Sequence, residues 1–565
     1  MNASCITRWC TVTALVAVGV TIGLNQHIAA QQPLPPPQPQ ASAIGQDGVE
    51  VLTRGPVHEA FAETITFDPE PGIVAPKAPP AAIEELPPQQ RPAGENLTWI
   101  PGYWAWDDER NDFLWVSGIW RALPPGRQWV PGYWGQSRQG FQWTSGYWAD
   151  AEASEIQYLP EPPATVEAGP NIAAPSADDI WLPGCWMWQQ NRYAWRPGYW
   201  TQGHQDWDWV PDHYVWTPSG YVFVDGYYDY SVSRRGIVFA PVYFDGGLRT
   251  QSGFSYSPST VINPSVFVSH LFLRPGYGHY YFGDYYGSDY RSAGYSPWFS
   301  FHSSRRGYDP IYANQRWQHR HDRDWEHRAK TDYRNYRDNE DARPPRTWAA
   351  QRELAGRGET SDRRSIEVAA PLQELARKKD SPFRLQPVDQ QEQQRFGQRR
   401  QEYRKYLQQR QQLEATAART PAVDPANPSG PARRPLPRSP FVATPVQQLD
   451  KKNAPPQRHE VLKPDFQVQP QPRTRGGQSG ARQADRQGAA GAAQQQNPQA
   501  RRNVGSQGQP QQGQRVNQGN RQGASAGQSQ GQGGNRGQAQ STSNNQSQST
   551  SRNQSSGESK KKDKD

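Results

Sequence analysis

Paired tryptophans recur at a regular spacing in the first half of the chain and dominate its pattern of hydrophobic positions. Six copies of a W-x-x-G-x-W hexapeptide run from Trp99 to Trp200, with Pro-Gly or Ser-Gly between the two Trp of each copy. The first Trp residues of successive copies are 16, 14, 14, 38 and 14 positions apart. The residues that define these copies are Trp99, Gly102, Trp104, Trp115, Gly118, Trp120, Trp129, Gly132, Trp134, Trp143, Gly146, Trp148, Trp181, Gly184, Trp186, Trp195, Gly198 and Trp200.

Three degenerate copies continue the pattern. They are Trp209-Val-Pro-Asp-His-Tyr214, Phe223-Val-Asp-Gly-Tyr-Tyr228 and Phe239-Ala-Pro-Val-Tyr-Phe244. A 14-residue unit is too short for a helical hairpin or a propeller blade, but it fits a strand of about seven residues plus a turn. The segments between copies, such as 136–140, are polar and compatible with turns. The pattern therefore predicts a mainly β fold, an antiparallel meander of short strands.

The spacing within a copy predicts that each strand is kinked. Two Trp five positions apart would point to opposite faces of a regular strand. Glycine permits a bend or bulge and a close approach of backbones, and proline cannot donate to a ladder inside a sheet. We therefore expect kinked strands whose paired Trp both pack, with rings stacking between neighbouring copies.

The copies fall into two blocks, 99–148 and 181–245, separated by the Pro-rich segment 149–180. Burial of the nine Trp of the first block does not offset the conformational entropy lost on ordering its fifty residues. We therefore expect the two blocks to dock on each other.

Outside the repeats, the pattern changes several times along the chain. Two charged stretches show apolar residues at roughly helical spacing, and the residues beyond them are dominated by Pro, Gln, Gly, Asn, Ser and Arg. The predicted parts are a signal peptide (1–30), a Pro/Gln-rich extended segment (31–98), the first repeat block (99–148), a Pro-rich linker (149–180), the second block (181–245), a Gly/Tyr-rich region of strands and loops (246–313), a charged helix (314–342), a linker (343–387), a Gln/Arg-rich helix (388–418) and a disordered low-complexity tail (419–565).

The N-terminus has the features of a secretory signal. Arg8 precedes an apolar stretch of about 14 residues, and Ala29-Ala30 offers a small-residue cleavage site. A membrane-spanning helix needs roughly 20 apolar residues, so cleavage is favoured over retention as an anchor. We therefore expect an exported protein, periplasmic, at the cell surface or extracellular, with no transmembrane helix after cleavage.

Composition sets the kind of core that this chain can build. Only 34% of the 565 residues are hydrophobic, but 12% are aromatic and 22 are Trp. Any core is therefore aromatic more than aliphatic. Cys185 is the single thiol outside the signal. A buried free thiol is favoured over an intermolecular disulfide, because free cysteines are commonly buried.

The repeats resemble the YXWGXW, or W-x-x-G-x-W, repeat family of exported bacterial proteins. The resemblance is close over residues 99–200 and weaker over 209–244, where Asp212 replaces Gly and Tyr214 replaces Trp. It implies export and a β-repeat, and it supplies no ligand, activity or catalytic residue.

Sequence motifs for catalysis are absent. The chain has no H-E-x-x-H pair, Gly-Lys-Ser/Thr phosphate loop, dinucleotide fingerprint or C-x-x-C pair. Asp107, Asp108 and Glu109 form an acidic run in a predicted turn, and a solvated turn is favoured over a glycosidase acid/base pair. We expect a protein that is not an enzyme and has no cofactor.

One cluster has side chains that could bind a metal. It consists of His319, His321, Asp322, Asp324 and His327. Arginines lie between these residues and would repel a cation, so a salt-bridged, solvated helix is favoured over a weak divalent site. We expect no metal site.

The tail carries dispersed positive charge, with ten Arg and one acidic residue between Pro470 and Gly557. Such a segment is similar in composition to nucleic-acid-binding tails, but export makes nucleic acid an unlikely partner. Envelope polysaccharide or another anionic envelope polymer is the expected partner, and a merely solubilising tail is an equal alternative. Self-association is a further expectation.

The leading functional hypothesis is a structural or interaction protein of the cell envelope or extracellular matrix, with the Trp repeats as a β platform and the basic tail as a tether. The alternative is a carbohydrate-binding module that uses exposed Trp and Tyr. An envelope enzyme is the third hypothesis, and it requires a cleft with converging carboxylates or His.

Overall fold

The computed structural model describes seven stretches of the chain, all within the first of its two compact units, residues 1–469. The predicted signal peptide at 1–30 and the tail beyond residue 456 lie outside the described residues. The described stretches are 47–94, 96–303, 305–356, 367–378, 384–419, 431–450 and 454–456.

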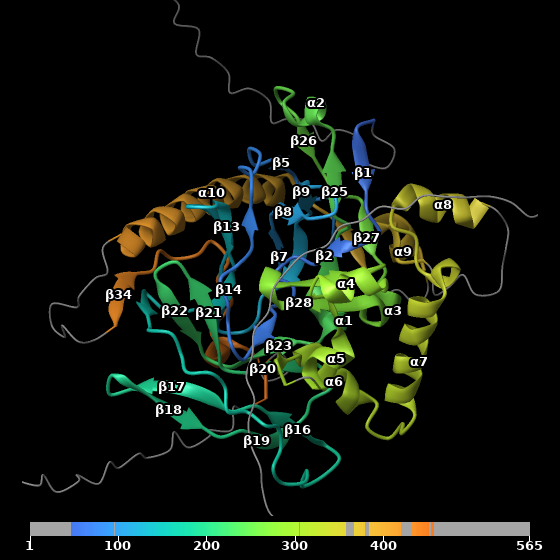
Figure 1. The fold of residues 1–565 in the computed structure, drawn as a ribbon. Helices are drawn as coiled ribbons and strands as arrows, with labels where there is room; N and C mark the ends of the chain where they lie inside the picture. The colour runs from blue at the N-terminus through green and yellow to red at the C-terminus, as the bar shows by residue number, and fades with distance from the viewer. Residues whose placement is uncertain are drawn as a thin grey trace, which may run out of the picture. The chain divides into compact units, whose positions relative to one another are not determined.

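The first eight copies pair in chain order, the first with the second, the third with the fourth and so on, and each pair forms one long antiparallel hairpin (Figure 1). The Pro-Gly or Ser-Gly step, or Pro-Asp and Asp-Gly in the fourth hairpin, divides each arm of a hairpin into two short strands. The first hairpin contains β7 (Leu97–Ile100), β8 (Tyr103–Asp107), β9 (Asp112–Val116) and β10 (Ile119–Ala122), and the second contains β11 (Arg127–Val130), β12 (Tyr133–Ser137), β13 (Gly140–Thr144) and β14 (Tyr147–Asp150). The third contains β16 (Asp179–Leu182), β17 (Cys185–Gln189), β18 (Arg192–Arg196) and β19 (Tyr199–Gln202), and the fourth contains β20 (Trp207–Val210), β21 (His213–Thr217), β22 (Gly220–Val224) and β23 (Tyr227–Tyr230).

The register places the first Trp of each copy opposite the second Trp of its partner copy. Trp99 faces Trp120 and Trp104 faces Trp115, with ring centroids 5.3 and 5.1 Å apart. The other hairpins repeat this arrangement with rings edge-on or tilted, a geometry that aromatic pairs prefer. The predictions of a mainly β fold, kinked strands and paired rings are confirmed. The 16-residue step in the first hairpin is explained by a longer turn, since residues 108–111 join its tip strands.

The ninth copy, 239–244, does not form a hairpin of its own. The strands on either side of its kink are β24 (Gly236–Val238) and β25 (Val242–Phe244). They pair with β10 and β9, so each adds a third strand to one of the two strand pairs of the first hairpin. This pairing joins the two repeat blocks, as their expected docking requires.

The segment before the repeats belongs to the core. From Val49 onward it contributes short strands to several sheets, and the side chains of Val57, Ala60 and Ile65 are at most 1% exposed. β5 is parallel to its partner β26 (Ser255–Tyr256), and the other strands of this segment are antiparallel to their partners. The strands are β1 (Val49–Val51), β2 (Gly55–Pro56), β3 (Ile65–Thr66), β4 (Val74–Ala75), β5 (Glu84–Glu85) and β6 (Gln90–Pro92).

Two of the predicted boundaries are wrong. The predicted linker 149–180 contains β15 (Glu155–Tyr158), which pairs with β34 (Ala432–Pro435) from the predicted tail. Phe441 follows β34, is 1% exposed and packs on Tyr403. A few apolar residues in a Pro- and Arg-rich window are enough to pack this segment against the fold, although the composition of the window indicates disorder.

The second half of the chain adds helices and short strands around the hairpins. The predicted helix 314–342 is two helices, because the first ends with His319 as its C-cap and the ring of His319 stacks on Trp325 at the start of the second. The predicted linker 343–387 contains helices and strands, whereas the predicted helix 388–418 is confirmed. The helices are α1 (Val232–Arg235), α2 (Gly246–Arg249), α3 (Pro264–Phe267), α4 (Ser288–Ser292), α5 (Trp298–Ser303), α6 (Pro310–Gln318), α7 (Trp325–Asp338), α8 (Trp348–Gly356), α9 (Leu372–Arg377) and α10 (Gln390–Arg419), with single 3-10 turns at η1 (Val268–His270), η2 (Pro275–Tyr277), η3 (Glu340–Ala342) and η5 (Val446–Gln448). The remaining strands are β26 (Ser255–Tyr256), β27 (Thr260–Ile262), β28 (Leu271–Arg274), β29 (His279–Phe282), β30 (Ser296–Pro297), β31 (Gly307–Tyr308), β32 (Ala369–Pro371) and β33 (Leu385–Pro387).

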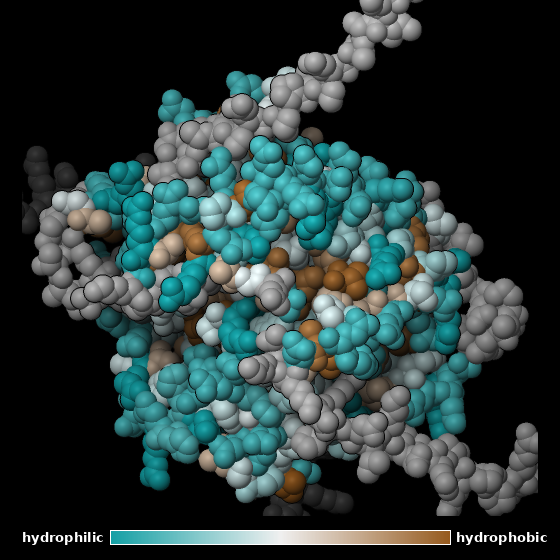
Figure 2. Space-filling view, turned by 180° about the vertical axis from the view of Figure 1, so that it is seen from behind, coloured by the Kyte–Doolittle hydropathy of each residue, from teal (hydrophilic) through white to brown (hydrophobic). Residues whose placement is uncertain are grey.

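The long helix α10 lies across the first two hairpins (Figure 1). Its Arg410 and Glu414 are buried and form an ion pair, and Glu414 accepts a hydrogen bond from the hydroxyl of Tyr133. Hydrophilic side chains cover most of the face shown in Figure 2, with small hydrophobic patches between them. Among the described residues, no helix is both long and apolar enough to cross a membrane.

Candidate functional site

The glycine of each repeat copy lies beneath the first Trp of the partner copy. A Cβ placed on Gly118 would approach Cζ2 of Trp99 to 2.5 Å, and a Cβ on Gly102 would approach Nε1 of Trp115 to 2.8 Å. In the next two hairpins an added Cβ would likewise lie 2.4–2.6 Å from an atom of the Trp ring. These pairs are Gly132 with Trp143, Gly146 with Trp129, Gly184 with Trp195 and Gly198 with Trp181. The first Trp of each copy thus packs on the Gly of its partner copy, and this reciprocal contact explains why the motif occurs in pairs.

A buried glutamate binds the kinks of the first hairpin. Glu85 accepts hydrogen bonds from the backbone N–H of Gly102 at 2.6 Å, the backbone N–H of Gly118 at 2.9 Å and Nε1 of Trp115 at 3.0 Å. Glu85 belongs to β5, outside the repeat, and is 2% exposed. A single carboxylate therefore satisfies both Gly N–H groups that the kinks leave without a ladder partner.

The second and third hairpins have equivalent glutamates. Glu59 accepts from Nε1 of Trp143 at 2.8 Å and from the N–H of Gly146 at 2.9 Å. Glu167 accepts from the N–H of Gly184 at 2.6 Å and from Nε1 of Trp181 at 3.2 Å. We call Glu85, Glu59 and Glu167 the clamp glutamates.

The fourth hairpin contains its own carboxylate. Asp212 occupies the position of the motif glycine, and its Oδ1 accepts a hydrogen bond from the N–H of Gly226 at 2.5 Å. Its other oxygen pairs with Arg196 of the third hairpin. The substitution of Asp for Gly therefore keeps the interaction between a carboxylate and a kink, with the carboxylate supplied from within the repeat.

Sequence reasoning missed the clamp glutamates, although a signal for two of them is present. Glu85 and Glu167 each stand 17 residues before the first glycine of their hairpin, and each follows a similar segment, Pro79-Pro-Ala-Ala-Ile-Glu-Glu85 and Pro162-Pro-Ala-Thr-Val-Glu167. The signal was hidden because both segments lie in stretches whose composition indicates an extended chain or a linker. Glu59 has no such sequence context.

The surroundings of Glu59 are the most chemically unusual part of the described chain. Burial raises the pKa of Glu59 to about 8 and lowers the pKa of His279 to about 4. The hydroxyl of Tyr103 lies 2.8 Å from Nε2 of His279 and accepts a hydrogen bond from the N–H of Glu59. Buried groups with shifted pKa values are typical of catalytic sites, but structural networks shift pKa values as well.

A small cavity opens beside Glu59. Its lining includes Glu63 and His213, and its volume is about 60 Å³. Ligand pockets commonly measure about 300–1,000 Å³. Both oxygens of Glu63 are used by the fold, one by the N–H of Trp148 and the other by the hydroxyl of Tyr227. Glu59 and Glu63 therefore act as acceptors for the repeat.

The raised pKa of Glu59 predicts a dependence of stability on pH. Between about pH 4.5 and pH 8 the folded state binds a proton at Glu59 that the unfolded state has lost, so this group's contribution to the free energy of unfolding falls as the pH rises. In Glu59→Gln this term is absent. We expect the free energy of unfolding of the wild type minus that of the variant to decrease by up to about 1.4 kcal/mol per pH unit.

Denaturant titrations at several pH values from about 5 to 8 measure this difference. The histidines near Glu59 are present in both proteins, so their own titration largely cancels. Glu152→Gln, at an exposed position, is the matched control and should give a curve parallel to that of the wild type. A difference that increases with pH would contradict the assignment.

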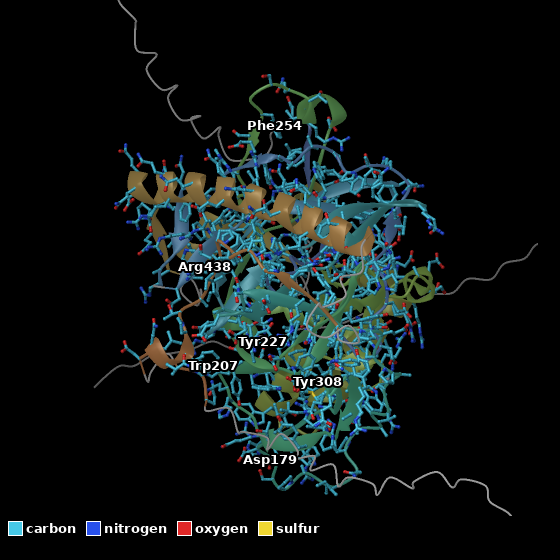
Figure 3. The ribbon with its side chains drawn as sticks, turned by 90° about the vertical axis from the view of Figure 1, so that its left-hand side faces the viewer. Asp179, Trp207, Tyr227, Phe254, Tyr308 and Arg438 are labelled. Carbon is cyan, nitrogen blue, oxygen red and sulfur yellow. The ribbon has the colours of Figure 1, made fainter. Side chains whose placement is uncertain are left out.

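The third hairpin differs from the others in its exposure. The eight motif Trp of the first two hairpins are at most 8% exposed, whereas Trp181, Trp186, Trp195 and Trp200 are all half-buried. Figure 1 shows β16–β19 at one end of the described fold, and Figure 3 labels Asp179, the first residue of this hairpin, at that end. Cys185 within it is a buried free thiol, as expected, and burial raises its pKa to about 12.

The acidic turn singled out from the sequence has structural partners. Asp107 accepts a hydrogen bond from Tyr243, and Asp108 and Glu109 pair with Arg274 and Arg54, so the acidic turn is tied to its neighbours.

In the His and Asp cluster at 319–327, Asp322 pairs with Arg328, and the centroid of the His319 ring lies 4.8 Å from that of Trp325. Within the described stretches no group of three or more His, Cys, Asp or Glu side chains could hold a metal ion.

Comparison with known proteins identifies the repeat. The family model described as the WXXGXW repeat (2 copies) matches residues 98–121, 180–201 and 206–227. These ranges correspond to the first, third and fourth hairpins, so the two-copy unit of the family is one hairpin of the fold. No curated protein and no solved structure matches the chain.

Proposed function

Because the chain carries the WXXGXW repeat, we propose that it is an exported structural or interaction protein of the cell envelope, in which the third hairpin presents its aromatic residues to a partner. The first, second and fourth hairpins form the scaffold. The basic, Pro-rich and Gln-rich parts of the sequence attach or space this scaffold within the envelope.

The observation that carries this proposal is the contrast between the third hairpin and the first two. Its ring pairs, Trp181 with Trp200 and Trp186 with Trp195, have centroid distances of 5.4 and 5.3 Å, as in the buried hairpins. The same internal geometry is therefore kept where the rings are half exposed and contribute less burial to the core. Half-exposed Trp at the end of a rigid fold is typical of an interaction surface, since Trp is enriched among residues that dominate binding energy.

Co-sedimentation with isolated envelope fractions tests the proposal. Trp186→Ala combined with Trp195→Ala should reduce binding about tenfold, because the loss of aromatic anchors commonly costs one or more kcal/mol of binding energy. Leu354→Ala, at a residue that is 39% exposed on α8, should bind as the wild type does. A wild-type protein that neither sediments with the envelope nor self-associates would remove the support for the proposal.

Carbohydrate binding is the second candidate, and it is favoured by the half-exposed rings of the third hairpin. Indole faces that reach solvent can stack on sugar rings. Collisional quenching of Trp fluorescence distinguishes the two candidates. If sugars bind, envelope glycans should protect the quenchable Trp, and Trp195→Phe should reduce that protected fraction. A signal that glycans leave unchanged would exclude this candidate.

A non-catalytic role is part of the same proposal. It is supported by the use of both oxygens of Glu59 and Glu63 as acceptors for the fold's own donors. The positive charge of the tail supports an anionic envelope polymer as partner. An envelope enzyme remains the third candidate, and hydrolysis of envelope polymers by the purified protein would revive it.

A further inference from the structure

Two hairpins of the repeat are covered by segments with the same chemistry. In the first hairpin the carbonyl of Ala81 accepts a hydrogen bond from Nε1 of Trp104 at 3.0 Å, and Glu85 binds the N–H of Gly102. In the third hairpin the carbonyl of Ala164 accepts from Nε1 of Trp186 at 3.1 Å, and Glu167 binds the N–H of Gly184.

The covering segments share a pattern that explains this likeness. Each has Pro-Pro-Ala followed, three or four residues later, by the clamp glutamate, with Ile or Val just before the acidic position or pair. Proline favours an extended chain and has no N–H to satisfy, so such a segment mainly offers carbonyl and carboxylate acceptors. The hairpin supplies the complementary donors, two indole N–H groups and a glycine N–H. The donors of a W-x-x-G-x-W hairpin therefore match the acceptors of an extended acidic segment.

The two receptors differ in how firmly their peptide is held. In the first hairpin Glu85 is 2% exposed and Ile83 is 8% exposed, so this segment is part of the core. In the third hairpin Val166 and Ile172 are 58% and 63% exposed. The resident segment there is held mainly by bonds from indole, hydroxyl and glycine donors, including one from Nε1 of Trp200 to the carbonyl of Ile172.

We propose that the third hairpin is a binding site for an extended Pro-Pro-Ala peptide of a partner protein that carries a glutamate three or four residues after the Ala. Residues 160–172 of the chain are the resident ligand of this site, and the partner's segment replaces them. This inference rests on the proposed function and names the class of partner. The carboxylate of the partner binds the N–H of Gly184 and Nε1 of Trp181 in place of Glu167.

A synthetic peptide with the sequence of residues 160–172, labelled for fluorescence anisotropy, provides the probe. The receptor is the full chain in which residues 160–172 are replaced by Gly and Ser, so that the site is vacant. We expect saturable binding, and a peptide with Gln in place of Glu167 should bind about tenfold more weakly, because hydrogen bonds to a charged acceptor are the stronger ones. An unlabelled peptide of residues 78–87 should compete.

Three results would overturn the inference. The first is no binding by a vacant chain that unfolds at the temperature of the wild type, and the second is equal binding of the Glu and Gln peptides. The third result is unchanged hydrogen exchange, and it applies if the vacant chain does not fold. In that case the wild-type chain is mixed with peptide at millimolar concentration, which is comparable to the effective concentration of the tethered segment. Hydrogen exchange around residues 164–172 should then accelerate as the resident segment is displaced, and unchanged exchange would refute the exchangeable site.

These outcomes are distinct from failure of the proposed function. If the peptide does not bind but Trp186→Ala with Trp195→Ala weakens envelope binding, the third hairpin remains an interaction surface and only the partner class is wrong. If the peptide binds but the protein does not sediment with the envelope, the receptor stands and the envelope role fails.

Discussion

Asp229→Ala is expected to lower the free energy of unfolding by about 3–5 kcal/mol, because it leaves the buried guanidinium of Arg121 without its counter-charge. Arg121 donates to both oxygens of Asp229 at 2.7 and 2.6 Å, and Arg235 lies 3.2 Å from one of them. Arg121, Asp229 and Arg235 are at most 3% exposed. Removal of one partner from a buried ion pair costs more than the pair itself contributes, since the remaining charge stays desolvated.

The position of this network in the fold makes the effect global. Arg121 belongs to the first hairpin, and Asp229 to the fourth. Arg121 also donates to the carbonyl of Ala60, and Arg235 to the carbonyl of Phe61, so the segment before the repeats is held as well. The loss of Asp229 therefore weakens the docking of the two repeat blocks.

Denaturant unfolding followed by Trp fluorescence measures the loss. Asp225→Ala is the matched control in the same hairpin, because Asp225 is exposed. Its free energy of unfolding should change by less than about 0.5 kcal/mol, as is usual for surface positions. Equal effects of the two substitutions would show that the buried network does not hold the blocks together.

Gly118→Ala is expected to cost about 3 kcal/mol or more, because overpacking against rigid atoms is destabilising. The added Cβ would lie 2.5 Å from Cζ2 of Trp99, 2.7 Å from the carbonyl oxygen of Ile100 and 2.8 Å from Oε2 of Glu85. The backbone carbonyl and the packed indole cannot both retreat. The substitution therefore separates the ring from the kink and displaces the clamp glutamate.

Gly246→Ala is the control for this prediction. Gly246 lies at the start of α2, and a Cβ there meets nothing within 4 Å. The free energy of unfolding of this variant should stay within a few tenths of a kcal/mol of the wild type or rise slightly, as expected for Gly to Ala at an unstrained helical site. If Gly118→Ala is tolerated as well as Gly246→Ala, the motif glycine is not required for close approach of the Trp ring.

The repeat itself was largely predictable from the sequence. The 14-residue step and the Pro-Gly or Ser-Gly step depend on local geometry, so kinked antiparallel strands with paired Trp followed from the residues. Helix α10 was also predictable, because its length and the spacing of its apolar residues are local properties of the sequence. The break between α6 and α7 was missed, since it depends on the contact of His319 with Trp325.

The candidate site was less predictable. Glu59, Glu85 and Glu167 bind their hairpins from segments whose composition indicates an extended chain or a linker, and only the fold shows which N–H groups they reach. The segment around Phe441 was predicted to be disordered from its composition, because composition does not show contacts with distant segments. Its few apolar residues are buried by packing against other parts of the chain, as Phe441 is against Tyr403.

The sequence by itself determined the hairpin unit, its kink and its aromatic pairs, because these arise from residues that are close in the chain. It did not determine which neighbouring copies pair, since a 14-residue step occurs both within hairpins, from Trp129 to Trp143, and between them, from Trp115 to Trp129. The tertiary structure decided the pairing, the carboxylate that binds each hairpin and the exposure of the third hairpin. These features depend on burial and on backbone donors shared by distant segments, and such interactions have no period along the chain.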